Sequence, residues 1–400
     1  MGALPSQNRN TEVEVADVFK RYSHKLPFTT KEQRKVINAI TSCRTSRLGG
    51  HVFKCDNCDN MLISYNSCRN RHCPKCQSLA KANWILDRKK ELLPVPYFHI
   101  VFTISDKLYP LTIQNKKVVY NILFKAVSDT LKEVAANPKN LGAQIGFMAI
   151  LHTWNQQLGA HPHIHCIVPG GGLSKNKERW IESNKNYFLC VKVLSVVFRG
   201  KFLALLKKAY NLSQLNFHGI LTALAEIEVF NDMLRQSCLK NWVVYSKRPF
   251  AGPEQVLDYL GRYTHRVAIS NNRILNVSET TVTFKWRDRK DNNKERIMSI
   301  DTLKFMRRFL LHILPSGFMK IRHYGFLGSP SKGRAVILCK VLLDVDDKEK
   351  ISKETPKTWR ELMFFLTGKD LSLCPLCNEG HMILFDSIQN ETRPPPVQLN

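Results

Sequence analysis

The sequence predicts an α+β protein of two or three domains, in which helices alternate with antiparallel strands. Two strand-like runs, 145–157 and 161–169, are joined by only three residues, a spacing typical of a β-hairpin. Amphipathic and basic stretches on both sides of this hairpin predict helices. The chain of 400 residues, with 44% hydrophobic content, is longer than one core usually requires.

Hydrophobic periodicity and start or stop residues define each element. Thr29 or Thr30 suits an N-cap, and Pro94 and Pro315 end helices. In chain order we expect helices in 12–43, a cysteine-rich segment in 43–77, a basic helix in 78–94, a strand in 97–105, a helix in about 108–135, the hairpin, a mostly helical stretch in 190–240, a strand in 242–250, a helix from Pro253, strands in 282–289 and 295–301, and a helix in 303–314.

These elements divide the chain into three consecutive regions. A helical and cysteine-rich domain covers 1–95, and a central domain covers 96–335 with a helical insertion at about 190–240. The C-terminal region, 336–400, contains a CPLC motif and ends in a proline-rich tail that we expect to be disordered.

The net charge and the lack of targeting signals indicate which partner and which cellular location to expect. The chain carries 60 Lys and Arg against 33 Asp and Glu, a net charge of +27, which favours a nucleic-acid partner over a merely basic or ribosome-associated protein. The N-terminus lacks the pattern of a signal peptide, and no apolar run approaches the ~20 residues that span a bilayer. We therefore expect a cytoplasmic, nucleoid-associated protein without membrane contact, whose 12 cysteines are reduced or bind metal.

Two C-x-x-C motifs predict a zinc site in the cysteine-rich segment. Cys55 and Cys58 are followed, after fourteen residues, by Cys73 and Cys76. Zinc takes four thiolate or imidazole ligands at about 2.0–2.3 Å, and each motif presents two sulfurs to one ion. The segment is too short and polar to fold around an apolar core, so metal would supply its stability.

Further residues allow a second zinc ion, although a lone His or Cys is more often simply packed. The CPLC motif at 374–377 is only half of a site, which Cys339 could join. Basic residues of the segment, among them Arg69 and Arg71, suit contact with DNA phosphates, and a solvated face is the alternative. The potential ligands of the second ion are Cys43, His51, Cys68 and His72.

Histidines alternate along the strand HPHIHC. His161, His163 and His165 point to one face, because successive side chains of a strand alternate. Buried imidazoles side by side need partners, and a divalent metal supplies them. The HxH pattern also occurs in hydrolases and dioxygenases. Gly170–Gly172 follow as a predicted loop, a plain turn or a place where DNA approaches the backbone.

A pair of tyrosines follows almost a hundred residues later. Tyr259 and Tyr263 are four apart, which places both phenols on one face of the predicted helix. Arg262 and Arg266 repeat this spacing on an adjacent face, where they could hold phosphates. An ordinary amphipathic helix with two core tyrosines is the alternative.

With these motifs the chain resembles the two-tyrosine HUH transposases of rolling-circle insertion sequences. The resemblance implies that 1–95 is a zinc-binding and DNA-binding domain and that 96–335 is an HUH catalytic domain. Such a domain is an antiparallel sheet flanked by helices, with the histidines on a central strand and the tyrosine helix across its face. The similar blocks span roughly residues 25–330 in family order: CRTSRLGGHVFKCDNC, YNSCRNRHCPKCQ, HTWNQQLGAHPHIHCIVPGGGLS, KRPFAGPEQVLDYLGRYTHRVAIS and RRFLLHILPSGFMKIRHYGFL.

The resemblance implies a role for each matching residue. His163 and His165 are the pair that holds Mg²⁺ or Mn²⁺, and Tyr259 and Tyr263 are the nucleophiles. Gln156 lies seven residues ahead of His163, where related enzymes often place a third metal ligand.

The implied reaction is transesterification on single-stranded DNA at the element ends and the target. A tyrosine oxygen attacks a phosphodiester, forms a 5′-phosphotyrosine and releases a 3′-OH, with help from Lys247, Arg262 or Arg266. The sequence contains no Walker-type G-x-x-x-x-G-K-[ST] motif, so we expect host replication or helicase proteins to unwind the DNA.

Three alternative functions remain open from the sequence. A rolling-circle replication initiator would use the same chemistry, and a non-catalytic zinc-dependent DNA-binding protein would use none of it. A zinc or iron hydrolase built on HxH would give no role to Tyr259 and Tyr263.

Overall fold

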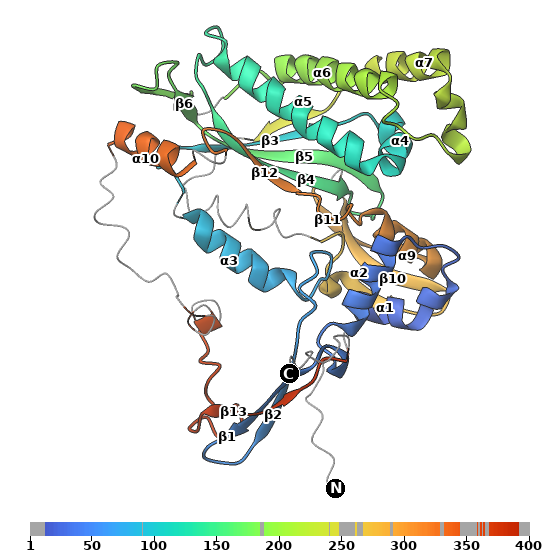
Figure 1. The fold of residues 1–400 in the computed structure, drawn as a ribbon, viewed down its shortest axis with the longest axis vertical. Coiled ribbons are helices and arrows are strands. Elements are labelled where there is room, and N and C mark those ends of the chain that lie inside the picture. Colours follow the sequence, from blue (N-terminus) through green and yellow to red (C-terminus); the bar gives the residue numbers. More distant parts are fainter. Residues whose placement is uncertain are drawn as a thin grey trace, which may run out of the picture. The chain divides into compact units, whose positions relative to one another are not determined.

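The chain forms two compact units. The first comprises Met1–Leu86, His265–Ile313 and Lys353–Asn400, and the second comprises Asp87–Thr264 and Leu314–Ser352. The computed structural model describes residues 13–89, 91–184, 188–239, 241–247, 261, 267–288, 291–328, 332–344, 358, 361, 363–364 and 368–391 (Figure 1).

The second unit is built on a five-stranded sheet in which all neighbouring strands are antiparallel. The strands lie in the order β12 (Ile321–Gly325), β4 (Gly146–Trp154), β5 (Ala160–Pro169), β3 (Tyr97–Thr103) and β8 (Val244–Lys247). β4 and β5 form the predicted hairpin, and β5 is the middle strand of the sheet. The expectation that the histidines lie on a central strand is therefore confirmed.

Helices α5 (Lys116–Ala136) and α6 (Val191–Asn211) cover one face of this sheet (Figure 1). Phe198 of α6 lies edge-on to Phe102 of β3, with ring centroids 5.1 Å apart. The alternation of side chains sends apolar residues of the two central strands into the same core. These residues are Phe98, Ile100 and Phe102 of β3 and Ile164, Cys166 and Val168 of β5.

Shorter elements complete the second unit. They are α4 (Tyr109–Gln114), α7 (Ile227–Cys238), α10 (Lys332–Leu342), the ribbon of β6 (Gly171–Leu173) and β7 (Trp180–Glu182), and the 3-10 turns η3 (Asp106–Leu108) and η4 (Gly219–Ala225).

Gly171 and Gly172 begin β6, where the sequence predicted a loop. A Cβ on Gly171, whose φ is +153°, would lie 2.5 Å from the carbonyl oxygen of Ile181. A Cβ on Gly172 would lie 2.6 Å from the carbonyl oxygen of Gln144. Close approach of the chain's own backbone therefore explains these two glycines, and DNA is not needed to account for them.

The first unit packs three helices on a small antiparallel sheet. The helices are α1 (Val15–Tyr22), α2 (Lys31–Ser42) and α9 (Thr302–Leu311), and the strands lie in the order β11 (Lys294–Asp301), β10 (Thr281–Asp288), β9 (Ile274–Val277). The rings of Phe19 and Phe309 meet edge-on at 5.4 Å. Thr30 caps α2 as predicted, because its hydroxyl accepts a hydrogen bond from the Gln33 backbone N–H at 3.2 Å.

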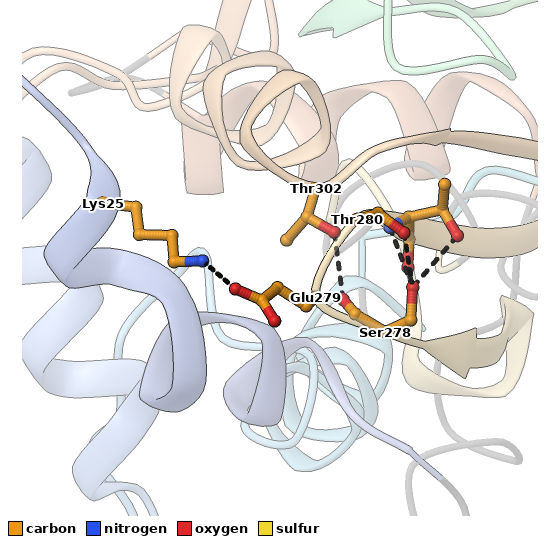
Figure 2. A network of polar contacts seen from close by, with 6 residues as sticks. Lys25, Ser278, Glu279, Thr280 and Thr302 are labelled. Carbon is orange, nitrogen blue, oxygen red and sulfur yellow. Dashed lines mark hydrogen bonds and ion pairs between the residues drawn. The ribbon is translucent and has the colours of Figure 1, made fainter.

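A polar network links the segment after α1 to the turn before β10 (Figure 2). Lys25 Nζ pairs with Glu279 Oε1 at 2.5 Å, which lowers the pKa of this exposed carboxyl group. Thr302, at the start of α9, donates a hydrogen bond from Oγ1 to the carbonyl oxygen of Ser278 at 3.1 Å. The turn is thus held from both the N-terminal segment and α9.

A second sheet in the first unit joins segments that are far apart in the sequence. Its strands lie in the order β13 (Met382–Ile388), β1 (Gly50–Cys55), β2 (Met61–Tyr65), and β13 pairs antiparallel with β1 (Figure 1). α3 (Gln77–Lys89) begins in this unit and ends in the second. The unit's 3-10 turns are η1 (Ser23–Lys25), η2 (Ser46–Leu48) and η5 (Asn271–Arg273).

The two units interleave along the chain, whereas the sequence predicted three consecutive regions. Residues 265–313, expected in the central domain, and the segment from 353 onwards, expected to stand apart, belong to the same unit as the N-terminal helices. Strand pairing such as that of β13 with β1 does not depend on chain distance, so composition alone could not reveal it. Among the helices that the structure describes, none has the length and apolarity to cross a bilayer.

Truncation of Phe198, a buried side chain of α6, should destabilise the second unit. Phe198 is fully buried and also contacts Trp242 at a centroid distance of 5.3 Å, so Phe198→Ala should lower the free energy of unfolding by about 3–5 kcal/mol. Urea unfolding followed by far-UV circular dichroism measures this change. Val196→Ala on the exposed side of α6 is the control and should change stability by at most about 0.5 kcal/mol.

Candidate functional site

Three buried histidines converge on the sheet face opposite α5 and α6. His163 and His165 lie on β5, and His152 lies on β4 directly opposite His163 in the strand register. One ring nitrogen from each of the three lies within 4.8 Å of the other two. All three side chains are at most 6% exposed, so the imidazoles face one another away from bulk solvent.

Hydrogen bonds orient two of these rings. His163 donates a hydrogen bond from Nδ1 to the carbonyl oxygen of His161 at 2.6 Å, which leaves the lone pair on Nε2. Nδ1 of His165 lies 2.7 Å from Nε2 of His99 on β3. When His165 donates this hydrogen bond, its Nε2 also carries a lone pair. Outer partners of this kind orient metal-binding histidines.

His161 has a different environment from its two neighbours on β5. Its Nδ1 is hydrogen-bonded to the hydroxyl group of Tyr109 at 2.8 Å. Burial raises the pKa of Tyr109 to about 12, so this phenol stays protonated. His161 is not part of the group of three converging histidines.

Gln156 lies in the turn between β4 and β5 and not on a strand. The sequence placed it in the strand before the histidines, but β4 ends at Trp154. Sequence reasoning missed His152 and His99. His152 could have been found by pairing the hairpin from its turn, but a register irregularity between His152 and Trp154 obscures that pairing. His99 comes from a strand far away in the sequence.

The donor set fits a divalent transition-metal ion. Three neutral imidazoles suit Mn²⁺ and other first-row ions, whereas Mg²⁺ prefers oxygen ligands. An oxygen ligand such as the Gln156 side chain would therefore matter more for Mg²⁺ than for Mn²⁺.

The predicted nucleophiles lie outside the described residues. This holds for Tyr259 and Tyr263 and for the neighbouring Arg262 and Arg266. Gly261, between the two tyrosines, is described as helical and buried.

Lys247, a predicted phosphate contact, lies at the edge of the sheet. It is the last residue of β8 and the register partner of His99 on β3. The chain therefore leaves β8 beside the strand that supports His165.

Four cysteines of the N-terminal segment form one tetrathiolate group. Sγ of Cys76 lies 3.5 Å from that of Cys43 and 3.6 Å from that of Cys68, and Cys73 completes the set within 4.8 Å. A tetrahedral zinc ion with sulfurs at about 2.3 Å would hold them about 3.8 Å apart. A hydrogen bond with Cys68 lowers the pKa of Cys43.

The two N-terminal C-x-x-C motifs do not share one site as the sequence predicted. Cys73 and Cys76 join the group just described, whereas Cys55 and Cys58 meet the C-terminal CPLC motif in a second group. The reason is the fold, because Cys55 ends β1 and β13 pairs alongside it. Cys339 is buried in α10 of the other unit.

His51 and His72 are in neither cysteine group. His51 is exposed on β1, and His72 is half-buried in the loop between Cys68 and Cys73. Both groups are already complete with four thiols each, so neither needs an imidazole.

The two arginines of the zinc segment differ in exposure. Arg69 is exposed and has a left-handed backbone with φ of 52°. Arg71 is half-buried, and burial lowers the pKa of its guanidinium group. Arg69 is therefore the better placed of the two for contact with a phosphate backbone.

Comparison with known proteins assigns these features to one family. A family model described as “Putative transposase” matches residues 146–334, and one described as “Transposase zinc-binding domain” matches residues 14–104. The chain is 47% identical over 386 residues to “Putative transposase y4qJ” from Sinorhizobium fredii, covering 96% of this chain and 97% of that protein. It is 27% identical over 303 residues to “Transposase for insertion sequence element IS801” from Pseudomonas savastanoi pv. phaseolicola, covering 74% of this chain and 70% of that protein. No solved structure matches the chain.

Zinc in the first cysteine group should shield its thiols from alkylation. Cys68 and Cys76 are only half-buried, so burial alone would leave them open to iodoacetamide. We expect both to be modified only after zinc is removed with a chelator, as measured by peptide mass spectrometry. Exposed Cys238 is the internal control and should react in both cases. Equal labelling of Cys68 before and after chelation would contradict a bound metal.

Proposed function

This chain belongs to the family of transposases with an N-terminal zinc-binding domain, and we propose that it cleaves and rejoins single-stranded DNA through covalent bonds to tyrosine. The observation that carries this proposal is the group of three converging imidazoles, His152, His163 and His165, on adjacent strands. Such a group suits a divalent ion that binds a phosphodiester.

Tyr259 and Tyr263 are the proposed nucleophiles. The phenolic oxygen attacks the scissile phosphorus and the bond from phosphorus to the 3′ oxygen breaks, so that a 5′-phosphotyrosine and a free 3′-OH result. The phenolic proton leaves to solvent or a nearby base, and the 3′ oxygen takes up a proton. The covalent link conserves the energy of the phosphodiester, so rejoining requires no nucleotide cofactor.

The bound ion would be held by Nε2 of His163, Nε2 of His165 and His152. When bound, Mn²⁺ or Mg²⁺ polarises the scissile phosphate and neutralises the charge that develops on it. The hydrogen bond to the carbonyl oxygen of His161 keeps His163 in the tautomer that the ion requires, and donation from Nδ1 of His165 to His99 would do the same for His165.

Chain connectivity supports delivery of the tyrosines to this face. Eleven residues lie between Lys247, the register partner of His99, and Tyr259, so the two residues can be at most about 40 Å apart. Lys247, Arg262 and Arg266 are the proposed phosphate contacts near the reacting group.

Two tyrosines suit two consecutive strand transfers. One phenol holds the first 5′ end while the other attacks at the second end or at the target. The name of the relative from Pseudomonas supports an insertion sequence as the substrate, and it favours transposition over replication initiation. We propose that host replication or helicase proteins expose the single strands in the nucleoid.

The excess of basic residues supports binding to DNA on both units. The net charge of +27 favours a polyanion, and Arg69 on the zinc segment is exposed. We propose that the zinc-binding unit contacts DNA at the element ends.

Removal of either phenol should stop transposition, because each transfer needs its own nucleophile. We expect Tyr259→Phe and Tyr263→Phe each to abolish transposition of an element with matched ends. At least one of them should still form a covalent adduct on a single-stranded end oligonucleotide with Mg²⁺ or Mn²⁺, detected by denaturing gel electrophoresis. The double variant should form none.

Tyr109→Phe is the matched control for this experiment. Its hydroxyl group bonds to His161, and a pKa of about 12 makes it a poor nucleophile, so the variant should retain the adduct. An adduct in the double variant Tyr259→Phe/Tyr263→Phe would overturn the assignment of the nucleophiles.

The third metal ligand can be identified from Mn²⁺ affinity measured by titration calorimetry. Loss of an outer hydrogen-bond partner costs about 10–100-fold in affinity, so His152→Ala should cost at least that much. Gln156→Ala should change Mn²⁺ affinity far less, since its side chain belongs to a turn. The reverse order of effects would assign the position to Gln156 and leave His152 as a packing residue.

A further inference from the structure

The second cysteine group brings together the two ends of the described chain. Cys55 ends β1 and Cys58 follows it, whereas Cys374 and Cys377 precede β13. The family model for the zinc-binding domain ends at residue 104, so it contains only half of this group.

The sulfur positions match a tetrahedral metal site. Sγ of Cys55 lies 3.8 Å from that of Cys377, and Sγ of Cys58 lies 3.7 Å from that of Cys374. A tetrahedral ion with four sulfurs at about 2.3 Å requires about 3.8 Å between them. A disulfide needs about 2.05 Å, so neither pair is bonded.

Backbone N–H groups point at these sulfurs, as thiolates require. Such hydrogen bonds stabilise the negative charge that four sulfurs bring to one ion. The Asn57 N–H donates to Cys55 (3.4 Å), the Leu376 N–H to Cys374 (3.4 Å) and the Gly380 N–H to Cys377 (3.3 Å).

Gly380 allows the two motifs to approach each other. A Cβ at this position would lie 2.5 Å from Sγ of Cys55 and 2.6 Å from Cβ of Asn57. The neighbouring His381 donates its backbone N–H to Asp56 Oδ1 at 2.7 Å and accepts a hydrogen bond from the Asp56 N–H at 3.1 Å. The C-terminal motif is therefore fitted against the N-terminal one by backbone contacts.

The sheet that carries this group has too little apolar core to hold itself together. Ile383, Leu384 and Phe385 of β13 are 55%, 57% and 63% exposed. Among the described residues, the buried cluster around the sulfurs consists of Cys55, Cys374 and Met382, with Phe53 and Leu62 partly buried against it. Small sheets of this kind depend on metal or other cross-links for stability.

We propose that Cys55, Cys58, Cys374 and Cys377 bind a second zinc ion that fastens β13 to β1. The zinc-binding unit then depends on a segment more than 300 residues after its first motif. Because the ligands come from two distant segments, the site can fill only after Cys377 has been synthesised. A chain that stops before residue 374 would therefore lack this site. The inference does not depend on the tyrosine chemistry proposed above.

Zinc content of the full-length protein tests this site directly. We expect Cys374→Ser/Cys377→Ser to contain one zinc fewer per chain than the wild type, measured by inductively coupled plasma mass spectrometry. Comparison with the wild type removes any contribution of zinc at the histidines. Cys238→Ser, at an exposed cysteine outside both groups, is the control and should lose none.

Amide hydrogen exchange tests whether β13 itself depends on the zinc ion. Loss of the ion should release β13, so amide protection in 382–388 should fall at least about tenfold in Cys374→Ser/Cys377→Ser. Cys68→Ser/Cys76→Ser should also lose one zinc but should keep protection of β13. Retention of the zinc bound to the first group shows that Cys374→Ser/Cys377→Ser is folded.

The wild-type protein provides a test that needs no variant. After exchange into Co²⁺, thiolate-to-cobalt absorption should increase up to two equivalents per chain, one for each tetrathiolate group. Saturation at one equivalent, or an unchanged zinc content in Cys374→Ser/Cys377→Ser, would overturn the proposal. Recovery of Cys55–Cys377 or Cys58–Cys374 disulfide peptides from unreduced protein would also overturn it, in favour of a redox cross-link.

Discussion

The two-residue alternation of β5 is the constraint on which the candidate active site depends. Ile164, Cys166 and Val168 face the helices, and His163 and His165 face the opposite side. A slip of one residue in the register would exchange the two sets, placing imidazoles in the apolar core. Burial of the apolar set under α5 and α6 therefore determines where the imidazoles point.

Because β5 is the middle strand of the sheet, strands on both of its sides help to position the imidazoles. Neighbouring strands on both sides contribute a histidine to the same face, His152 from β4 and His99 from β3. Side chains on strands of a packed sheet have little freedom, so the ring nitrogens can be held at metal-binding separations before an ion arrives. The proposed catalytic ion would thus be supported by the same core that stabilises the unit.

Part of the first unit depends on interactions other than an apolar core. Its helices share an apolar contact between Phe19 and Phe309, but the sheet of β13, β1 and β2 buries very little. Two groups of four thiols lie within that part of the unit. Metal–thiolate bonds can replace an apolar core in such a segment, which leaves basic side chains such as Arg69 exposed.

Local features could be predicted from the sequence, because they depend on neighbouring residues. The hairpin of β4 and β5, the capping of α2 by Thr30 and the shared face of His163 and His165 all follow from short-range patterns. The C-x-x-C spacing likewise identified pairs of candidate zinc ligands. Which pairs combine, how the two units share the chain, and the presence of His152 and His99 on the histidine face emerged from the three-dimensional fold. Those outcomes depend on strand pairing between distant segments, such as β1 with β13 and β3 with β5, which local spacing does not encode.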